Sequence, residues 1–195
     1  MNILLIWPSW SGKTSIQEYL IKNYWFTKPL NATSRSPRSE NAYDVDVNWD
    51  FKNSEMDTYL FLTKDQFERK MRNWDFAEFN MYNWDYYGTL NQIDYTKNNV
   101  IVIDPVWAES LIKKFLLDWV DYKTFFIDIT EEVQEHRLWF KRRESISTIN
   151  ERKLDFKYFD KDRYDVVLDW EDEIELNALK ILKEINFKIN LYNIW

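Results

Sequence analysis

The sequence predicts an α/β fold in which a parallel β-sheet is covered by helices on both faces. Two observations lead to this class. Short apolar segments alternate along the chain with amphipathic segments of helical spacing. The first apolar segment also runs directly into a short polar loop, and that loop runs into a helix that begins at about Lys13. This order of strand, loop and helix is typical of proteins that bind phosphate groups at the end of a parallel sheet.

The expected strands are short and consist mainly of apolar, β-branched or aromatic residues. The clearest is the run at 100–104, whose four apolar residues are all β-branched and which ends in the carboxylate of Asp104. The strands are expected at 3–6, 59–62, 76–79, 86–89, 100–104, 123–129 and 165–169. The pieces at 76–79 and 86–89 flank a turn, whereas helices separate most of the others, which indicates a parallel sheet.

The expected helices are marked by apolar residues at helical spacing and by capping residues. In the first helix Ile16, Tyr19 and Leu20 share one face. In the second, Thr63 is a suitable N-cap and Gln66 stands at the capping-box position. The helices are expected at about 13–23, from residue 64 onward, and at about 108–117, 131–141, 146–159 and 173–185.

Length, composition and charge agree with one mid-sized soluble domain. The chain has 195 residues, of which 45% are hydrophobic and 30% charged. Its net charge of −7 argues against general binding to nucleic acid or to an anionic membrane. It has no cysteine and one histidine, which excludes disulfides, thiolate chemistry and a histidine-rich metal site. No apolar run approaches the length of a membrane span or follows a basic leader, so the expected location is the cytoplasm.

The loop after the first strand carries most of a phosphate-binding P-loop. The pattern is G-x-x-x-x-G-K-[ST], and Gly12, Lys13 and Thr14 occupy its last three defined positions. In such a loop, backbone N–H groups surround the nucleotide phosphates, the lysine adds positive charge and the hydroxyl reaches Mg²⁺. The first glycine of the pattern is replaced by Trp7, and a second indole stands inside the loop at Trp10. The motif therefore predicts a phosphate site that two bulky side chains would obstruct.

Further short motifs follow this loop in a fixed order. They occupy residues 33–38, 57–61, 76–79, 86–89, 103–104, 137–138, 152 and 164–167. Together with the loop they resemble guanylate kinase over most of the chain, and the Arg-Ser-Pro-Arg and Tyr-Tyr-Gly-Thr segments are the most specific matches. The resemblance implies a P-loop kinase fold in three layers, formed by one domain of three parts. These are a core at 1–32, 96–130 and 156–195, an inserted nucleotide-monophosphate-binding subdomain at 33–95 and a small helical lid at 131–155.

The same resemblance implies transfer of the γ-phosphate of ATP, bound with Mg²⁺, to GMP or dGMP. This reaction brings two highly negative ligands together, so positioned cations carry most of the catalysis. The implied ATP-binding residues are Ser9, Ser11, Gly12, Lys13, Thr14 and Ser15, and Thr14 would also reach the metal. The implied catalytic cations are Lys13, Arg137, Arg142 and Arg152, with Lys141 or Arg143 as alternatives to Arg142.

An acceptor site is implied in the middle of the chain. Its residues would be Ser34, Arg35, Arg38, Tyr59, Glu78, Tyr87, Gly88, Thr89 and Asp104. The arginines would hold the acceptor phosphate through their planar forks, with hydrogen bonds from the two tyrosines. Glu78 would read the base, because guanine offers two adjacent N–H donors where adenine presents an acceptor, and Thr89 would reach the guanine carbonyl. Asp104 could orient Arg35, contact guanine or hold Mg²⁺ through water.

Tryptophan and glycine occur in unusual numbers. There are 11 tryptophans and two glycines, whereas glycine normally makes up about 7% of a chain. Trp7, Trp10, Trp74, Trp84 and Trp107 stand where the family resemblance implies glycine. Trp25, Trp49, Trp119, Trp139 and Trp170 lie in turn-like contexts. Turns, phosphate loops and helix ends favour a residue without a β-carbon, so the tryptophans occupy places that suit glycine.

Two explanations of the tryptophans compete. At face value, Trp7 and Trp10 crowd the phosphate loop, and the chain is a catalytically impaired relative that serves as a protein-binding module. Alternatively, these positions are encoded by UGA, which variant genetic codes assign to either tryptophan or glycine, and the source organism reads it as glycine. A nucleoside monophosphate kinase with another base preference is a further functional alternative.

Overall fold

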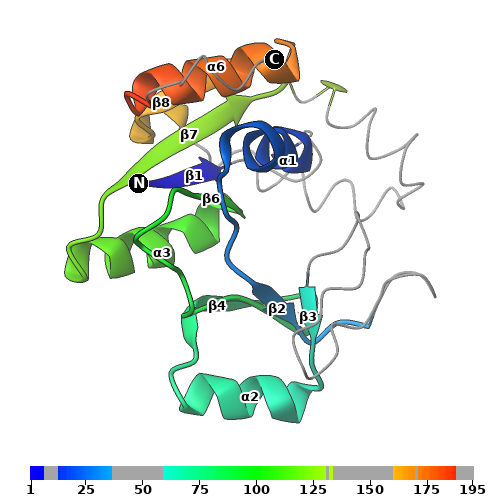
Figure 1. Cartoon of the computed structure of the whole chain (residues 1–195). Coiled ribbons are helices and arrows are strands. Elements are labelled where there is room, and N and C mark those ends of the chain that lie inside the picture. The colour runs from blue at the N-terminus through cyan, green and yellow to red at the C-terminus, as the bar shows by residue number, and fades with distance from the viewer. Residues whose placement is uncertain (7–12, 37–58, 131, 134–159, 170, 188–195) are drawn as a thin grey trace.

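The computed structural model describes residues 1–6, 13–36, 59–130, 132–133, 160–169 and 171–187 (Figure 1). This part of the chain forms two four-stranded sheets. The helices expected at 131–141 and 146–159 fall almost entirely outside it.

The first sheet is parallel throughout, with the strand order β6-β1-β7-β8. Its strands are β1 (Asn2–Ile6), β6 (Asn99–Ile103), β7 (Tyr122–Asp128) and β8 (Val166–Asp169). The central strand β1 places Ile6 opposite both Ile103 and Phe126. The carboxyl ends of these strands therefore lie along one edge of the sheet, as the sequence predicts.

Helices cover both faces of this sheet, and β1 supplies side chains to both. The helices are α1 (Lys13–Tyr24), α3 (Pro105–Leu117) and α6 (Ile174–Glu184). Ile3 and Leu5 are buried in the core shared with α1 and α6, whereas Leu4 and Ile6 are buried in the core shared with α3. Figure 1 shows these helices on opposite sides of the sheet, so the predicted three-layer α/β arrangement is confirmed. None of the helices described is long and apolar enough to cross a membrane.

The second sheet is mixed and has the order β3-β2-β5-β4. It contains β2 (Asn31–Thr33), β3 (Tyr59–Phe61), β4 (Phe76–Tyr82) and β5 (Asp85–Leu90), and α2 (Lys64–Arg72) packs against it. On α2, Phe67 is fully buried and stacks on Phe76 and Tyr86, with ring centroids 4.3 and 5.2 Å apart. The expected capping box is confirmed, because Thr63 and Gln66 each accept a hydrogen bond from the other's backbone N–H.

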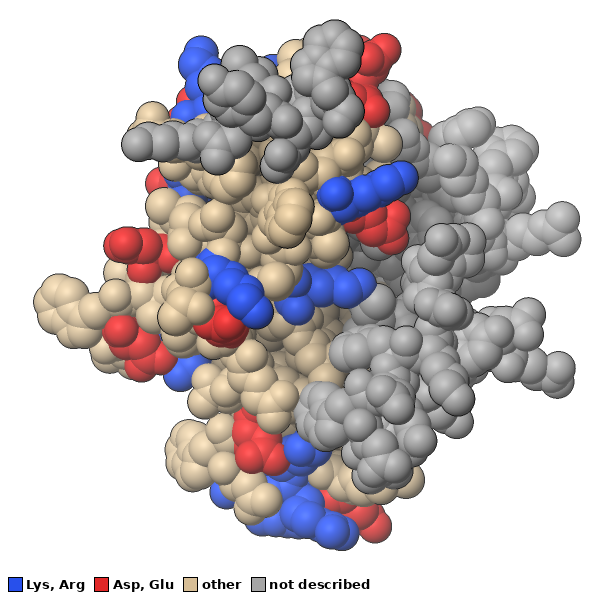
Figure 2. Space-filling model, viewed as in Figure 1, with Lys and Arg blue, Asp and Glu red and all other residues tan. Residues whose placement is uncertain are grey.

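Charged side chains of opposite sign are interspersed on the face of the molecule shown in Figure 2. Around α2, Lys70 pairs with Asp75 at 3.1 Å and Arg72 with Glu68 at 3.9 Å. Partly exposed pairs of this kind contribute about 0–1 kcal/mol each. The packing of Phe67 therefore holds α2 on the sheet more firmly than its ion pairs do.

Two local features differ from the sequence-based expectations. β2 is a strand that the polar sequence around Asn31 does not predict, and it forms because β3 and β5 pair with it on either side. α3 begins at Pro105, three residues before the expected start. The Asp104 carboxylate accepts a hydrogen bond from the N–H of Val106 at 3.0 Å, and proline suits the first helical position.

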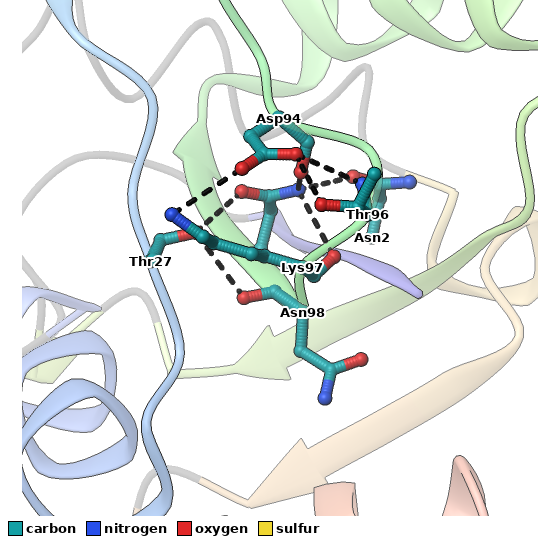
Figure 3. A network of polar contacts seen from close by, with 7 residues as sticks. Asn2, Thr27, Asp94, Thr96, Lys97 and Asn98 are labelled. Carbon is teal, nitrogen blue, oxygen red and sulfur yellow. Dashed lines mark hydrogen bonds and ion pairs between the residues drawn. The ribbon is translucent and has the colours of Figure 1, made fainter.

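A buried polar cluster joins the amino ends of β1 and β6 (Figure 3). The side-chain amide of Asn99 donates to Asn2 Oδ1 at 2.9 Å, and Asn99 Oδ1 accepts from the hydroxyl of Thr27 at 2.7 Å. Asn2 Nδ2 donates to the carbonyl of Asp121 at 2.8 Å. Each side-chain polar atom of the two asparagines has a partner, so the cluster fixes the register of these strands.

Candidate functional site

The elements on either side of the predicted phosphate loop have the expected geometry. β1 ends at Ile6 and α1 begins at Lys13, so residues 7–12 join the carboxyl end of the central strand to a helix N-terminus. Unpaired backbone N–H groups and the helix dipole make such a terminus suitable for phosphate. Ser9, Ser11 and Gly12 lie outside the described residues, as do the side chains of Lys13 and Thr14; Ser15 is half-buried in α1.

The second sheet brings Asn31, Glu78 and Thr89 together from three adjacent strands. Thr89 on β5 lies opposite Asn31 on β2 and opposite Glu78 on β4. The Thr89 hydroxyl is 2.8 Å from Glu78 Oε1 and 3.1 Å from Asn31 Oδ1, and the Thr89 backbone N–H donates to the same Oε1 at 3.0 Å. The structure thus places the predicted base-reading pair, Glu78 and Thr89, side by side.

Glu78 is a buried carboxylate with one oxygen left over. It is 5% exposed, and within the described part of the chain its Oε2 has no hydrogen-bond partner. Burial raises the pKa of Glu78 from 4.5 to about 7, although the two hydrogen bonds from Thr89 lower it. An unpaired buried acceptor is costly, so this oxygen is suited to accept an N–H from a ligand.

Gly88 allows β5 to approach β4 closely enough to hold Glu78 in this position. A Cβ at Gly88 would lie 2.8 Å from the backbone oxygen of Glu78 and 2.9 Å from Cδ1 of Phe76. The pairing of β4 with β5 also shifts register between Phe76 and Glu78, as in a β-bulge. Gly88 thus allows close packing of the two backbones, and its role as an acceptor-site residue stays a prediction.

A row of aromatic rings runs from β3 across β5 to α3. The rings of Tyr59 and Tyr87 are 6.2 Å apart, and Tyr87 stacks on Trp107 at 5.5 Å. The guanidinium of Arg35, just beyond β2, lies 5.5 Å from the Tyr59 ring and 5.2 Å from the Phe61 ring. The arginine is buried to 8% exposure. The structure thus brings three predicted acceptor-site residues, Arg35, Tyr59 and Tyr87, into one neighbourhood.

Ser34 and Asp104 both make local structural contacts. The Ser34 hydroxyl donates to Asp85 Oδ1 at 3.2 Å and accepts from the N–H of Tyr86 at 2.8 Å, which fastens the start of β5. Asp104 caps α3 at the carboxyl end of β6. Their roles toward a ligand stay predictions.

The remaining predicted cations fall outside the described ranges. They are Arg38, Arg137, Arg142 and Arg152, together with the alternatives Lys141 and Arg143. Among the residues that the structure does describe, no group of three or more histidine, aspartate or glutamate side chains is placed to hold a metal ion.

Sequence reasoning missed Asn31 as a member of this site. Its side chain lies beside Thr89, but the matched motif begins two residues later, at Thr33. The sequence offered one signal for it. Asn31 stands two positions before Thr33, so in a strand both side chains lie on the same face, and this strand pairs with β5. That strand was itself not expected.

The fold defines the structural class of the protein, which has the α/β fold of the P-loop kinases. A guanylate kinase from Anaplasma phagocytophilum has a similar structure, with a TM-score of 0.65 over 95% of this chain and 84% of that chain, at 18% identity. Sequence relatives agree with this likeness. A guanylate kinase of Fusobacterium nucleatum is 34% identical over 83 residues, one of Chlamydia caviae 29% over 153, and one of Bacteroides thetaiotaomicron 33% over 115.

These alignments cover 43%, 74% and 55% of this chain, and 38%, 67% and 50% of the respective relatives. The chain thus spans between about two fifths and two thirds of the length of these relatives. No family model matches the chain. The resemblance to guanylate kinases that the motifs indicate is nonetheless confirmed, in sequence by the relatives and in fold by the solved structure.

Proposed function

We propose that this chain transfers the γ-phosphate of ATP to GMP, giving ADP and GDP, with dGMP as a further acceptor. The observation that carries the proposal is the buried Glu78, whose Oε2 has no partner among the described residues. The likeness to guanylate kinases supports it.

Glu78 would select guanine through its pairing edge. The N1–H and the amino group of guanine are adjacent donors, so one carboxylate can accept from both. Adenine presents an acceptor at the corresponding ring nitrogen, which would face a carboxylate without a proton between them. Thr89 and Asn31, which flank this carboxylate on neighbouring strands, would complete the polar lining of the base site.

Arg35 would hold the acceptor phosphate, aided by Arg38 and by the phenols of Tyr59 and Tyr87. The two rings beneath the Arg35 guanidinium limit its motion, so less conformational entropy is lost when phosphate binds. The phosphate would then lie between the second sheet and the carboxyl end of β6, where Asp104 caps α3.

The donor phosphates would lie at the N-terminus of α1, where residues 7–15 would supply backbone N–H groups and Lys13 a positive charge. A strand followed by a helix N-terminus fits the phosphates of MgATP. Thr14 would hold the magnesium ion, which neutralises charge on the phosphates when bound. An oxygen of the GMP phosphate attacks the γ-phosphorus in line as the bond to the ADP oxygen breaks. Arg137, Arg142 and Arg152 would close over the reacting groups and exclude water.

The proposed parts of the molecule follow from these roles. The first sheet and its helices form the core, the second sheet with α2 forms the acceptor-binding insert, and residues 131–155 form the lid. Within this proposal both substrates are small cytoplasmic nucleotides.

The test is a comparison of acceptors before and after Glu78→Gln. Formation of ADP is measured by a coupled assay with GMP, dGMP, AMP and UMP, using the printed chain and a version with glycine at positions 7 and 10. Glu78→Gln should lower kcat/KM for GMP about 10–100-fold, because one hydrogen-bonded charged acceptor is lost. The matched control, exposed Glu171→Gln, should change nothing. Unaltered guanine selectivity in Glu78→Gln would instead support another base preference.

The same assay distinguishes a kinase from the alternative function, a protein-binding module. In that case the printed chain would form no ADP, although a GMP titration would still show binding. Phosphoryl transfer to GMP by the printed chain contradicts the binding-module interpretation.

A further inference from the structure

Five tryptophans lie in the described part of the chain, and four of them have a positive φ angle. The values are 62° at Trp25, 60° at Trp74, 67° at Trp84 and 54° at Trp119. A β-carbon disfavours this left-handed region, which glycine adopts readily and asparagine tolerates. The other non-glycine residues with positive φ in these ranges are Asn83 and Asn186, which obey the rule.

Two of these tryptophans end helices in the way that glycine commonly does. After α2, Trp74 donates to the carbonyl of Met71, and Asp75 donates to the carbonyl of Lys70 at 3.0 Å. These two bonds form a Schellman motif, and Trp74 stands at its left-handed position, where glycine is the usual residue. After α3, Trp119 has the same place, because the next residue donates to the carbonyl of Phe115 at 2.9 Å.

Of the other two tryptophans, Trp84 lies in a hairpin turn and Trp25 at the end of a helix. Trp84 is the second residue of the two-residue loop between β4 and β5, and Asn83 is the first. Both have positive φ, as a type I′ hairpin turn requires, and the preferred sequence of that turn is Asn-Gly. Trp25 directly follows the last residue of α1.

None of the four indoles is buried to compensate for the backbone conformation. Trp25 is 81% exposed, Trp74 85%, Trp84 81% and Trp119 94%. Tryptophan normally contributes by burying its large ring. The fifth described tryptophan, Trp107, differs on both counts, since it lies in α3 without a positive φ and stacks on Tyr87.

We infer that Trp25, Trp74, Trp84 and Trp119 are glycines in the protein as its source organism makes it. Their codon, written as tryptophan in the printed sequence, is then read as glycine in that organism. The inference rests on backbone geometry and exposure, and holds whatever reaction the chain catalyses. The same codon at the other tryptophan positions would restore glycine throughout, including at Trp7 and Trp10 in the phosphate loop.

The direct test is the chemical identity of the native protein. We expect UGA codons at the four positions, and tryptic peptides from the source organism whose masses show glycine there. UGG codons, or peptide masses that show tryptophan, would overturn the inference.

A second test uses stability and needs no native material. The chain with all four tryptophans replaced by glycine is compared with a matched chain in which all four are replaced by alanine. Both changes remove the exposed indoles, but only glycine removes the β-carbon. The glycine set should raise the Tm by roughly 2 °C or more per position relative to the alanine set. Equal Tm values would contradict the backbone argument, and activity measurements do not enter either test.

Discussion

At the residue scale, the position of the Glu78 carboxylate is unfavourable for folding but favourable for binding a ligand. Thr89 satisfies one oxygen with two hydrogen bonds, while the other oxygen is buried without a partner within the described chain. Polar groups in binding sites are often left in this way for a ligand to complete. Two measurable consequences follow from the pKa of about 7.

The first consequence is that Glu78 lowers the stability of the folded chain at neutral pH. Its pKa in the folded protein is about 7, above the ordinary 4.5, so the folded chain holds a proton that the unfolded chain releases between these values. The favourable contribution of the protonated form is complete below pH 4.5 and is lost as the pH rises to about 7. Glu78→Gln, which is neutral at every pH, should raise the free energy of unfolding at pH 8 by on the order of 3 kcal/mol.

Denaturant titrations of both forms at acidic and alkaline pH measure this difference. The gain from Glu78→Gln should shrink as the pH falls from about 7 and be nearly gone below about 4.5, where both side chains are neutral. A gain that is independent of pH would contradict the assignment to this carboxyl. Exposed Glu171→Gln serves again as the control and should show no gain.

The second consequence concerns GMP binding and has the opposite sign with pH. The proposed contact needs the ionised carboxylate, so below pH 7 GMP must displace a proton from Glu78. Its affinity should fall about tenfold for each pH unit below that value and level off above it. Calorimetric titrations across this range measure the effect, and Glu78→Gln should bind weakly and lose the part of the pH dependence that comes from this carboxyl. Unchanged affinity at acidic pH would exclude Glu78 as the base reader.

At the element scale, most of the described strands and helices were predictable from the sequence. Apolar runs gave the parallel strands, and the Thr63–Gln66 capping box gave α2 its start. Two things were not predictable. β2 is polar and becomes a strand only through its neighbours, and Asn31 joins the site only through that pairing. Motif matching could find Glu78 and Thr89, but the orphan oxygen between strands is visible only in three dimensions.

A substitution at Gly88 tests whether the close approach of β4 and β5 matters for the proposed GMP site. Gly88→Ala would drive a methyl group against the Glu78 carbonyl and the Phe76 ring, so β4 must shift. We expect a loss of about 1–3 kcal/mol of stability and a weaker affinity for GMP, with the affinity for ATP retained. Met81→Ala, at an exposed position of β4, should leave both affinities unchanged. Equal weakening of ATP and GMP binding would point to general unfolding rather than displacement of Glu78.

Asp104 joins the end of β6 to the start of α3, and two substitutions separate its cap from its charge. Asp104→Ala removes the acceptor of the Val106 N–H and should cost about 1 kcal/mol of stability. Asp104→Asn keeps an N-cap acceptor and should fold with nearly unchanged stability. We expect the asparagine form nevertheless to lose kcat/KM, because the proposed roles toward Arg35, guanine or Mg²⁺ favour a carboxylate. Full activity in Asp104→Asn would reduce this residue to a helix cap.

At the scale of the whole molecule, the proposed sites for the two nucleotides lie on different elements that meet near the carboxyl edge of the first sheet. At this edge α1 follows β1, and Asp104 follows β6. Helix α3, which Asp104 caps, contacts the second sheet where Trp107 stacks on Tyr87. Phosphoryl transfer depends on bringing two anions together with fixed cations. Under the proposed function, catalysis therefore depends on whether the phosphate loop, with tryptophan or glycine at positions 7 and 10, can bind ATP.

Activity of the chain with Trp7→Gly and Trp10→Gly, compared with that of the printed chain, tests this dependence. Glycines would let the loop backbone approach the phosphates, whereas the sequence predicts that two indoles in an eight-residue motif would obstruct it. Loss of one donor from a preorganised oxyanion hole costs about 10²–10³-fold in rate. By this measure the glycine form should be faster by about 100-fold or more at saturating GMP. A third chain with Trp107→Gly alone should keep the low rate of the printed form. Equal, full activity in the printed and glycine forms would refute the steric argument.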